Sequence, residues 1–361
     1  IGIGPTPLLY FSMYSRKLDS GIMITGSHNP PNYNGFKMLL KNKSIFGKDI
    51  LDIAKISSKG NFCKNKRGKI NKISMMDKYL FFLTNSANIK KNIKVAWDPG
   101  NGSSGEIISR LTKKLNGKHY LINEKIDGSF PAHHPDPTVA KNLVDLVYTV
   151  KKEKAELGIG FDGDADRIGI VDEKGNIFWG DQLLMLFARD LLKRKPGATI
   201  VGEVKCSQNL FKDIELHGGV AVMSAAGHSL IKKKMQEANA LLAGEMSGHV
   251  CFADGYYGFD DAIYAACRIL QIVASSEKKV SEMLADVPKT ASTPEIRIDC
   301  PDDRKFEIVR ELTESFREHY DIIDIDGVRI NFENGWALIR ASNTQPVLVL
   351  RFEADNTDQL D

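Results

Sequence analysis

The region from residue 176 to residue 243 alternates between helix-like and strand-like apolar runs, and this alternation constrains the fold more than any other feature of the chain. The predicted order is a helix over residues 183–192, strands over 198–204 and 220–224, a helix over 230–237 and a strand over 241–243. Strands that alternate with helices in this way are typical of an α/β unit with a parallel sheet.

Regions on both sides of this unit carry patterns of their own. Upstream, the sequence predicts a short buried strand over residues 21–24, a strand over 93–97, a helix over 107–115 and strands over 157–161 and 168–171. Downstream, a linker over residues 288–294 leads to a strand over 295–298, an amphipathic helix over 306–316 and strand-like runs over 322–325, 328–332, 337–340 and 347–352. This last part has an α+β pattern, and a chain of 361 residues has room for two to four domains.

Composition and charge exclude several classes of protein. Hydrophobic residues make up 42% of the chain, so cores can form, and the net charge of +3 argues against a dedicated nucleic-acid-binding protein. None of the five cysteines forms a C-x-x-C pair, which argues against a zinc site or a disulfide framework and favours a reducing, cytoplasmic setting. The chain contains no apolar run of membrane-spanning length, so we expect no membrane span.

The strongest local signal is an acidic loop, Asp162-Gly163-Asp164-Ala165-Asp166, between two predicted strands. Carboxylate oxygens are the ligands that Mg²⁺ and Ca²⁺ prefer in proteins, so the loop predicts a divalent metal site; the alternative is a solvated acidic turn. An EF-hand does not fit, because Arg167 replaces the glycine that the calcium loop requires and the flanking segments are strand-like.

A glycine-rich turn supports a different class of enzyme. Residues 100–105 read Gly-Asn-Gly-Ser-Ser-Gly between a predicted strand and a predicted helix, and Glu124 follows at the distance of a ribose-binding acid. This pattern is the dinucleotide fingerprint, so an NAD-dependent oxidoreductase is a serious alternative. The other interpretation is a tight strand-to-helix turn that needs glycine for its backbone conformation.

Three more loops carry reactive or ligand-binding side chains. Ser27, beside His28 on a loop with two prolines, is a candidate nucleophile. Residues 244–249, Gly-Glu-Met-Ser-Gly-His, follow a predicted strand at the edge where open α/β sheets bind ligands. Residues 340–345, Arg-Ala-Ser-Asn-Thr-Gln, offer a guanidinium, two hydroxyls and an amide, which suits a phosphate. Each loop taken alone is also compatible with ordinary turn chemistry.

Together and in this order, these loops resemble the α-D-phosphohexomutase superfamily, most closely its bacterial phosphomannomutase/phosphoglucomutase group. The resemblance runs from Pro5-Thr6-Pro7 to Leu350-Arg351-Phe352-Glu353. It implies three α/β domains and a C-terminal α+β domain around a central cleft, with the first domain truncated at its N-terminus. The implied domains are residues 1–73, 74–176, 177–288 and 289–361. The glycine turn then belongs to the second domain, and the dehydrogenase interpretation leaves the other loops unexplained.

The resemblance also implies a reaction. A hexose 1-phosphate and a hexose 6-phosphate interconvert through a phosphoserine at Ser27 and a hexose 1,6-bisphosphate, which also serves as activator. Mg²⁺ would be held by Ser27 and the three aspartates. The implied catalytic residues are Ser27, His28, Lys37, Arg167 and His228, with Lys37 or His228 as general acid and base. The implied substrate-binding residues are Lys205, Glu245, Ser247, His249, Arg340, Ser342, Asn343 and Thr344.

Several expectations accompany this assignment. The partners are small phosphosugars, and we expect a monomer without nucleic acid or membrane. Met246 resembles the group that uses mannose and glucose phosphates, whereas phosphoglucosamine mutase is the alternative within the superfamily. Two residues depart from the family's pattern, Ala165 and Gln345, and Ala165 would be strained if its φ were positive.

The remaining expectations concern surfaces and chain ends. Residues 64–72 and the lysines at 232–234 are predicted to be solvated, and His133 and His134 are interpreted as structural rather than metal-binding. The first residue is Ile1 and the last ones resemble a helix cut short, so we expect a fragment that lacks both ends of the family's chain and exposes apolar surface there.

Overall fold

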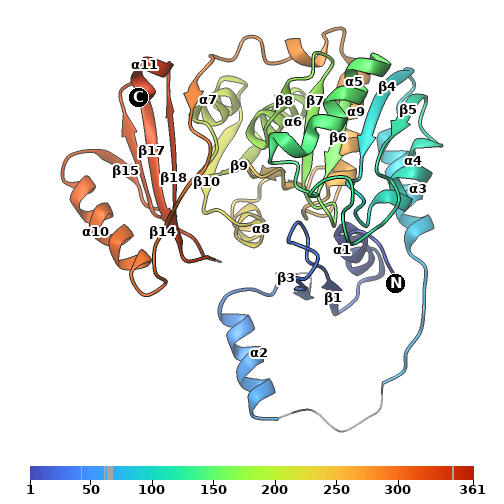
Figure 1. Ribbon diagram of the computed structural model, residues 1–361, viewed down its shortest axis with the longest axis horizontal. Helices are drawn as coiled ribbons and strands as arrows, with labels where there is room; N and C mark the ends of the chain where they lie inside the picture. The colour runs from blue at the N-terminus through green and yellow to red at the C-terminus, as the bar shows by residue number, and fades with distance from the viewer. Residues whose placement is uncertain (42, 61, 63–67, 344) are drawn as a thin grey trace.

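The computed structural model describes residues 1–41, 43–60, 62, 68–343 and 345–361. Four sheets follow one another along the chain, and Figure 1 shows the last of them beside the third, with the first below the second. The strands of these sheets lie between residues 20–44, 93–178, 199–252 and 291–354. The first, third and fourth sheets each lie inside one predicted domain, whereas the last strand of the second sheet, Ile177–Phe178, lies just beyond the boundary predicted at residue 176. The exact domain boundaries stay predictions.

The first sheet is small and antiparallel, in the order β1-β2-β3. Its elements are α1 (Thr6–Arg16), β1 (Ser20–Ile24), β2 (Phe36–Leu40), β3 (Lys43–Ser44) and α2 (Lys48–Ser58). The predicted strand at 21–24 is present, but the prediction that it is buried is wrong, since Ile22 and Ile24 are 61% and 67% exposed. α1 covers only one face of β1, where Gly21 meets Met13, and the other face is open.

The second sheet has the order β5-β4-β6-β7-β8, with β4 parallel to β5 and β6 and the last pairs antiparallel. β6 and β7 form a hairpin, so the acidic loop is the hairpin's connection. The predicted helix at 107–115 begins and ends earlier than expected, as α4. The elements of this part are α3 (Met76–Ala87), β4 (Ile93–Asp98), α4 (Gly105–Thr112), β5 (Gly117–Leu121), α5 (Val144–Glu153), β6 (Leu157–Phe161), β7 (Ile168–Asp172) and β8 (Ile177–Phe178), with a short 3₁₀ helix at Ala140–Leu143.

The third sheet has the order β10-β9-β11-β12, and its first three strands are parallel, as the alternation predicted. β12 adds an antiparallel edge, and α7 and α9 were not among the predicted elements. The elements are α6 (Gly180–Arg194), β9 (Thr199–Glu203), α7 (Gln208–Leu216), β10 (Val220–Ser224), α8 (His228–Glu237), β11 (Leu242–Gly244), β12 (Val250–Phe252) and α9 (Ala262–Ser275), followed by a 3₁₀ turn at Val280–Glu282.

The fourth sheet is antiparallel, in the order β13-β18-β17-β16-β15, with β14 also paired to β18. This confirms the α+β pattern, although the predicted linker at 288–294 contains the short strand β13. The elements are β13 (Ala291–Ser292), β14 (Ile296–Asp299), α10 (Lys305–Arg317), β15 (Asp321–Ile323), β16 (Val328–Phe332), β17 (Gly335–Ala341), β18 (Val347–Ala354) and α11 (Thr357–Leu360).

One apolar core joins the first three sheets, whereas the fourth is attached differently. The large core includes Phe11 of α1, Tyr79 of α3 and Tyr264 of α9. The fourth sheet contacts the third through Arg329, which is fully buried, donates to the carbonyl oxygens of residues 204 and 206 and lies over the ring of Trp336. None of the helices in the described part of the chain is long and apolar enough to cross a membrane.

Candidate active site

Ser27 lies in the turn between β1 and β2 and faces the acidic loop. Its backbone is left-handed, with φ of 52°, a conformation that a serine adopts only when its surroundings impose it. The Ser27 turn packs directly against the acidic loop, because a Cβ on Gly163 would lie 2.2 Å from the carbonyl oxygen of Ser27. Its hydroxyl donates to Asp162 Oδ2 at 2.9 Å and lies 3.3 Å from His28 Nδ1. The hydroxyl is thereby aimed at the acidic loop.

The three aspartates converge as the spacing predicted. Asp162, Asp164 and Asp166 are buried, and each offers an oxygen atom within 4.8 Å of the other two. Asp162 Oδ1 accepts the backbone N–H groups of residues 166 and 167, but Oδ1 of Asp164 and Oδ1 of Asp166 are buried without a hydrogen-bond partner among the described residues. Orphaned buried carboxylate oxygens fit a hard cation.

Ala165, the residue that departs from the family's pattern, is fully buried with φ of 57°. The condition stated for strain is therefore met, since a left-handed conformation costs an L-residue about 1–2 kcal/mol. The loop keeps this conformation because neighbouring backbone groups hold it. The N–H of Ala165 donates to the carbonyl of Asp162, and the carbonyl of Ala165 accepts from the first turn of α9.

Two cations lie against the aspartates. Lys37 on β2 donates to Asp164 Oδ2 at 2.7 Å and to Asp166 Oδ2, while Arg167 donates through Nε to His249 Nε2 at 3.0 Å. Burial would lower the pKa of Lys37, but Asp166 and Asp164 outweigh it and hold that pKa well above its usual range. The Lys37 side chain is therefore a fixed positive charge in this arrangement.

The crowding of carboxylates shows in their protonation. Burial and the charges of Asp166 and Asp164 hold the pKa of Asp162 well above its usual range. Burial would also raise the pKa of Asp166, but the charges of Lys37 and His249 outweigh burial and keep this pKa below its usual range. A further cation would relieve the repulsion that raises the pKa of Asp162. Burial and Arg167 lower the pKa of His28 to about 4, so this imidazole is neutral at physiological pH.

The loop after β11 meets the acidic loop directly. His249 pairs with Arg167 in an isolated β-bridge, and its ring lies 3.1 Å from Asp260 and 3.6 Å from Asp166. Glu245 is buried and accepts the N–H of Gly227 at 2.6 Å. The remaining predicted residue of this loop, Ser247, is half-buried.

His228 and Lys205 flank this loop. His228 begins α8, lies 3.1 Å from Asp260 and stacks on His249 with the ring centroids 5.2 Å apart. Burial and Lys232 lower the pKa of His228, so the ring is neutral and can accept a proton. Lys205, after β9, lies 3.3 Å from Glu295 and 3.6 Å from Glu203.

The predicted phosphate loop lies at the end of β17. Arg340 donates to Asp326 Oδ2 at 2.9 Å, and the same carboxylate accepts the N–H of Ala226 at 3.0 Å, next to the loop that precedes His228. Ser342 is buried and its hydroxyl accepts the N–H of Gln345, whereas Asn343 is exposed. Thr344 lies outside the described residues, so its predicted role is not tested by the structure. Of the predicted solvated stretch 64–72, residues 64–67 also lie outside, whereas residues 68–72 are exposed as predicted.

The glycine turn at residues 100–105 packs against the acidic loop. Its N–H groups at positions 101, 102, 103 and 105 all donate to protein carbonyls, including that of Gly163. A Cβ on Gly102 would lie 2.6 Å from the carbonyl of Gly163, and one on Gly105 would lie 1.8 Å from the carbonyl of Glu124. The donors that a dinucleotide pyrophosphate would need are already used, so these glycines serve close packing.

Some residues of the site were missed or misjudged from the sequence. Lys232 was predicted to be solvated, which is wrong, because it is 8% exposed and bonds Asp260 at 2.7 Å. Asp260 and Asp326 were not predicted as site residues. Thr6 and Thr25, whose hydroxyls both donate hydrogen bonds to Asp164 Oδ2, were not predicted to contact the acidic loop. Carboxylates and hydroxyls of this kind carry no local motif, because their partners are far away in the sequence.

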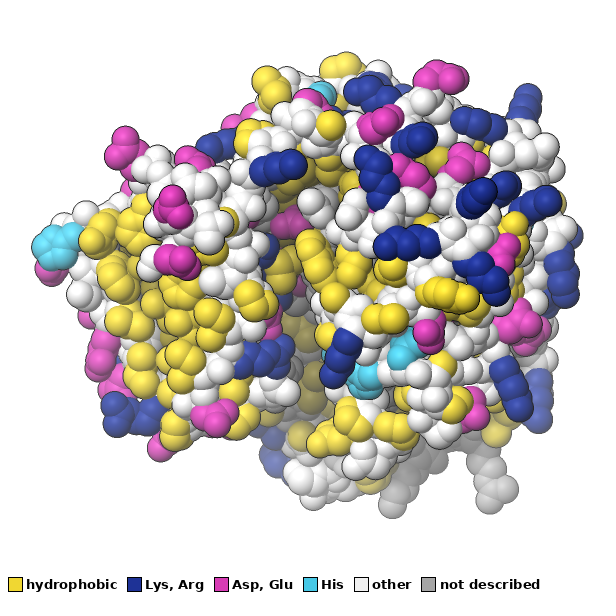
Figure 2. All heavy atoms as spheres, turned by 45° about the horizontal axis from the view of Figure 1, so that its top comes forward, with side chains coloured by type: hydrophobic (Ala, Val, Ile, Leu, Met, Phe, Trp, Pro, Cys, Tyr) yellow, Lys and Arg dark blue, Asp and Glu magenta, His cyan; other side chains and the backbone are white. Residues whose placement is uncertain are grey.

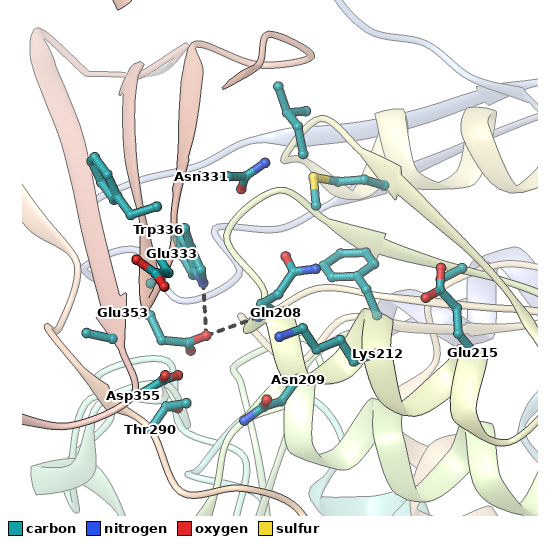
Figure 3. A pocket seen from close by; sticks show the side chains of 17 residues that line it. Gln208, Asn209, Lys212, Glu215, Thr290, Asn331, Glu333, Trp336, Glu353 and Asp355 are labelled. Carbon is teal, nitrogen blue, oxygen red and sulfur yellow. Dashed lines mark hydrogen bonds between the residues drawn. The ribbon is translucent and has the colours of Figure 1, made fainter. Parts of the chain in front are cut away.

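A cavity of about 440 Å³ lies elsewhere, between α7 and the fourth sheet. Figure 3 shows Glu353 at its wall, where it accepts from Trp336 Nε1 and from the N–H of Gln208. A second cavity, of about 500 Å³, is lined by the loop that carries Ser27 and by Asp164. The second cavity, not the first, adjoins the candidate nucleophile.

Comparison with known proteins identifies the family. Four family models match the chain in order along the sequence. They are phosphoglucomutase/phosphomannomutase alpha/beta/alpha domain I at residues 1–63, domain II at 77–175, domain III at 179–291 and the C-terminal domain at 295–361. The phosphomannomutase/phosphoglucomutase of Pseudomonas putida is 44% identical over 361 residues, which is all of this chain and 78% of that protein. The phosphoglucomutase of Neisseria gonorrhoeae is 44% identical over 359 residues, 98% of this chain and 78% of that protein.

A solved structure agrees with this assignment. The phosphoglucomutase/phosphomannomutase family protein of Burkholderia thailandensis superposes with a TM-score of 0.92 at 39% identity, covering 100% of this chain and 79% of that one. The matches run through all four sheets and through every loop described above. The chain therefore belongs to the phosphoglucomutase/phosphomannomutase family.

Proposed function

We propose that this chain interconverts hexose 1-phosphates and hexose 6-phosphates, as a phosphomannomutase/phosphoglucomutase, with Ser27 as the residue that carries the phosphoryl group. The observation that carries the proposal is the strained Ser27 turn, which aims the hydroxyl at the buried aspartates. The names of the Pseudomonas and Neisseria relatives support the reaction, and the four matching domains support its assignment to the whole chain. Strain of this kind collects at reactive positions.

The reaction has two transfers in opposite directions. In the first, the bond between phosphorus and the Ser27 oxygen breaks while a bond forms to the free hydroxyl of the sugar, giving a hexose 1,6-bisphosphate. The hydroxyl proton passes to a general base. In the second, the intermediate has turned end for end, and the other phosphoryl group moves to Ser27 while its sugar oxygen regains a proton. The same bisphosphate, supplied from outside, would phosphorylate Ser27 and act as activator.

His228 is the better candidate for the proton carrier. Lys37 is held as a fixed cation by two aspartates, and a group that stays protonated cannot accept a proton. His228 has a lowered pKa and is partly exposed at the start of α8. Lys37 and Arg167 then stabilise the negative charge of the phosphoryl group in transit, which is the main demand of this chemistry.

The acidic loop would hold Mg²⁺. The three buried aspartates, two of them with an orphaned oxygen, and the nearby Ser27 hydroxyl form an all-oxygen donor set that fits this ion. When bound, the ion neutralises charge on the transferring phosphoryl group.

The substrate would span the third and fourth domains. Glu245 and Ser247 would hold sugar hydroxyls beside His249, and Arg340, Ser342 and Asn343, with Thr344, would hold the phosphate that is not reacting, together with Lys205. A clamp remote from Ser27 serves both orientations of the intermediate, because each end of the bisphosphate carries the same group. Figure 2 shows acidic and basic side chains interspersed over one face, which does not suit a nucleic-acid-binding surface. A monomer that acts on small phosphosugars stays our expectation.

Intact mass and turnover together test the proposal. The purified chain is incubated with glucose 1,6-bisphosphate, and the parent should gain the mass of one phosphate while Ser27→Ala gains none. Glucose 1-phosphate turnover should fall at least about a thousandfold in Ser27→Ala, since no other group can carry the covalent intermediate. Ser342→Ala, a hydroxyl remote from the acidic loop, is the control that should still gain the phosphate. Normal turnover in Ser27→Ala would contradict the proposal.

A further inference from the structure

Asp260 is a fully buried carboxylate that none of the roles above uses. It lies in the connection between β12 and α9, and its exposed fraction is 0%. Its Oδ1 accepts from Lys232 Nζ at 2.7 Å. Its Oδ2 lies 3.1 Å from Nδ1 of His228 and 3.1 Å from Nδ1 of His249. One carboxylate therefore contacts a buried cation and two histidines of the candidate site.

The neighbouring residue, Asp261, is also a buried carboxylate, but its contacts differ from those of Asp260. Its Oδ1 accepts the N–H groups of residues 263 and 264 and so caps α9. Both of its oxygens accept from the hydroxyl of Tyr79, and Oδ2 accepts from Tyr256. The hydrogen bonds of the Asp261 carboxylate go to the first turn of α9 and to two buried tyrosines, whereas the contacts of Asp260 go to side chains of the candidate site.

The tautomer of His249 follows from its two neighbours. Arg167 donates through Nε to His249 Nε2 at 3.0 Å, and a guanidinium can only donate. Nε2 is therefore the acceptor, and the proton of the neutral ring must be on Nδ1, which faces Asp260. Nδ1 of His249 lies 3.1 Å from Asp260 Oδ2 but has no hydrogen-bond partner among the described residues, so Asp260 acts on this ring by its charge and its close contact. This contact favours the orientation in which Nε2 accepts from Arg167 beside the acidic loop.

His228 is held in a similar way. His228 and Lys232 are one helical turn apart on α8, and both reach Asp260. Lys232 Nζ also lies 3.2 Å from His228 Nδ1, so the carboxylate and the ammonium compete for that nitrogen. Lys232 already donates to Oδ1 of this buried carboxylate at 2.7 Å, and a proton on His228 Nδ1 supplies the donor that Oδ2 needs at 3.1 Å. With its proton on Nδ1, His228 keeps Nε2 as the nitrogen that accepts the substrate proton.

A second metal ion is the competing explanation for this cluster. Asp166, His228 and Asp260 offer ligand atoms within 4.8 Å of one another. However, the Lys232 ammonium is buried and already bonded to Asp260. Burial would lower the pKa of Lys232, but the charge of Asp260 outweighs it and raises that pKa above its usual range, so the lysine stays charged. A divalent cation would be placed next to this fixed positive charge, so the cluster is better explained as a carboxylate whose cation is the lysine.

We propose that Asp260, held by Lys232, is a positioning residue that fixes the orientation and tautomer of His228 and the orientation of His249 and, through His249, the place of Arg167. This rests on the mutase function proposed above. Carboxylates that orient a histidine from behind commonly change activity by about 10- to 100-fold when they are replaced, although they touch no substrate.

Asp260→Asn tests the proposal kinetically. Asparagine has one carbonyl oxygen and cannot accept from Lys232 and both histidines at once. In assays with glucose 1-phosphate and catalytic glucose 1,6-bisphosphate, kcat should fall about 10- to 100-fold while KM changes by less than about threefold. A folded variant that keeps the parent's kcat would overturn the proposal.

Asp254→Asn is the matched control. Asp254 is also buried and also bonds cations, Arg194 at 2.8 Å and Lys195 at 3.0 Å, but its side chain bonds no histidine among the described residues. This substitution should lower the melting temperature and leave kcat unchanged. An equal loss of kcat in both variants would show that any lost buried ion pair has the same effect, which would also overturn the proposal.

The double variant Asp260→Asn with Lys232→Met covers the case in which Asp260→Asn alone fails to fold. It removes both charges, so no uncompensated ammonium remains buried. The proposal expects kcat to stay as low as stated above, because the histidines still lack their acceptor. Recovery of the parent's kcat would mean that Asp260 only neutralises Lys232.

A measurement independent of turnover separates this proposal from the proposed function. In ¹⁵N-detected spectra of histidine-labelled protein, His228 should carry its proton on Nδ1 in the parent. In Asp260→Asn, Lys232 Nζ, which lies 3.2 Å from Nδ1, should donate to that nitrogen and move the proton to Nε2. The assignment comes from His228→Asn. If the parent had no mutase activity, the tautomer would still test the positioning role. An unchanged tautomer in Asp260→Asn would overturn it.

Discussion

The two halves of the candidate site differ in what their charged groups bind within the protein. In the acidic loop, Asp164 and Asp166 each keep a buried oxygen without a hydrogen-bond partner among the described residues. In the substrate half, the charged groups are already paired: Arg340 with Asp326, Lys205 with Glu295, and Glu245 with the N–H of Gly227. If the proposed function holds, the first half receives a cation without losing a protein partner, whereas the second exchanges protein partners for those of the substrate.

This difference has an energetic meaning. A group that lacks a partner gains the full interaction when its ligand arrives, while a group that is already bonded gains only the difference between two partners. Changes in the acidic loop should therefore lower kcat strongly. Changes in the substrate half should mainly raise KM and have smaller effects.

Removal of divalent metal should have the largest effect. With excess EDTA, turnover should fall by about 10³-fold or more, because the charge on the transferring phosphoryl group loses its counter-ion. Added Mg²⁺ should restore turnover, and Mg²⁺ should raise the melting temperature of the parent. Full activity in excess EDTA would contradict the proposal that the acidic loop binds a metal ion, and the two halves of the site would then no longer differ in this respect.

Asp162→Asn should come next. The amide keeps an oxygen for the N–H groups of residues 166 and 167 but loses the charge, so the loop should remain folded while kcat falls by about 100-fold. Asp172→Asn is the control, since Asp172 accepts the N–H groups of residues 174 and 176 at the other end of β7. Initial rates at saturating glucose 1-phosphate measure both, and equal rates in the two variants would count against a special role for Asp162.

Arg340→Met should act on binding instead. It removes the guanidinium that is now paired with Asp326, and we expect KM for glucose 1-phosphate to rise by about tenfold or more, with a smaller fall in kcat. Arg317→Met removes an exposed arginine that pairs with Asp324 and should change neither constant. A loss of kcat in Arg340→Met as large as that in Asp162→Asn would erase the distinction between the two halves.

The choice between sugars should be weak. On the proposed function, Glu245 and Ser247 hold the hydroxyls on carbons 3 and 4, which glucose and mannose share, and none of the residues assigned to the substrate above is assigned to carbon 2. The two epimeric 1-phosphates should then differ in kcat/KM by no more than about tenfold. Glucosamine 1-phosphate should be used less well, and Glu245→Gln should reduce turnover of both neutral sugars alike. A thousandfold preference for one epimer would show that another residue reads carbon 2.

The sequence predicted those parts of the site whose residues are contiguous. The acidic loop needs only three aspartates at alternate positions between two strands, and the Ser27 turn needs only its neighbours, so both were found. Lys232 was judged solvated because it lies in a run of three lysines, and its buried partner Asp260 is 28 residues away. Asp326 reaches Ala226 across 100 residues. Contacts of this kind depend on how the sheets pack, which no local pattern records.

The smallest predicted effect concerns Ala165, and it separates two opposing contributions. In Ala165→Gly, relief of the left-handed conformation should stabilise the protein by about 1–2 kcal/mol. Loss of a buried methyl group and the greater freedom of glycine in the unfolded chain should oppose this by a similar amount, about 0.8 kcal/mol and about 0.5–1 kcal/mol. We therefore expect the free energy of unfolding, measured in urea, to change by less than about 1 kcal/mol.

Ala266→Gly is the control that makes this small number informative. Ala266 is equally buried but lies inside α9 and is not among the residues with positive φ, so its replacement loses a methyl group and helix stability without any relief of strain. It should destabilise by about 2 kcal/mol. The difference between the two variants measures the strain stored in the acidic loop. If both variants were destabilised equally, the loop would carry no such strain, and the acidic half would owe its properties to its carboxylates alone.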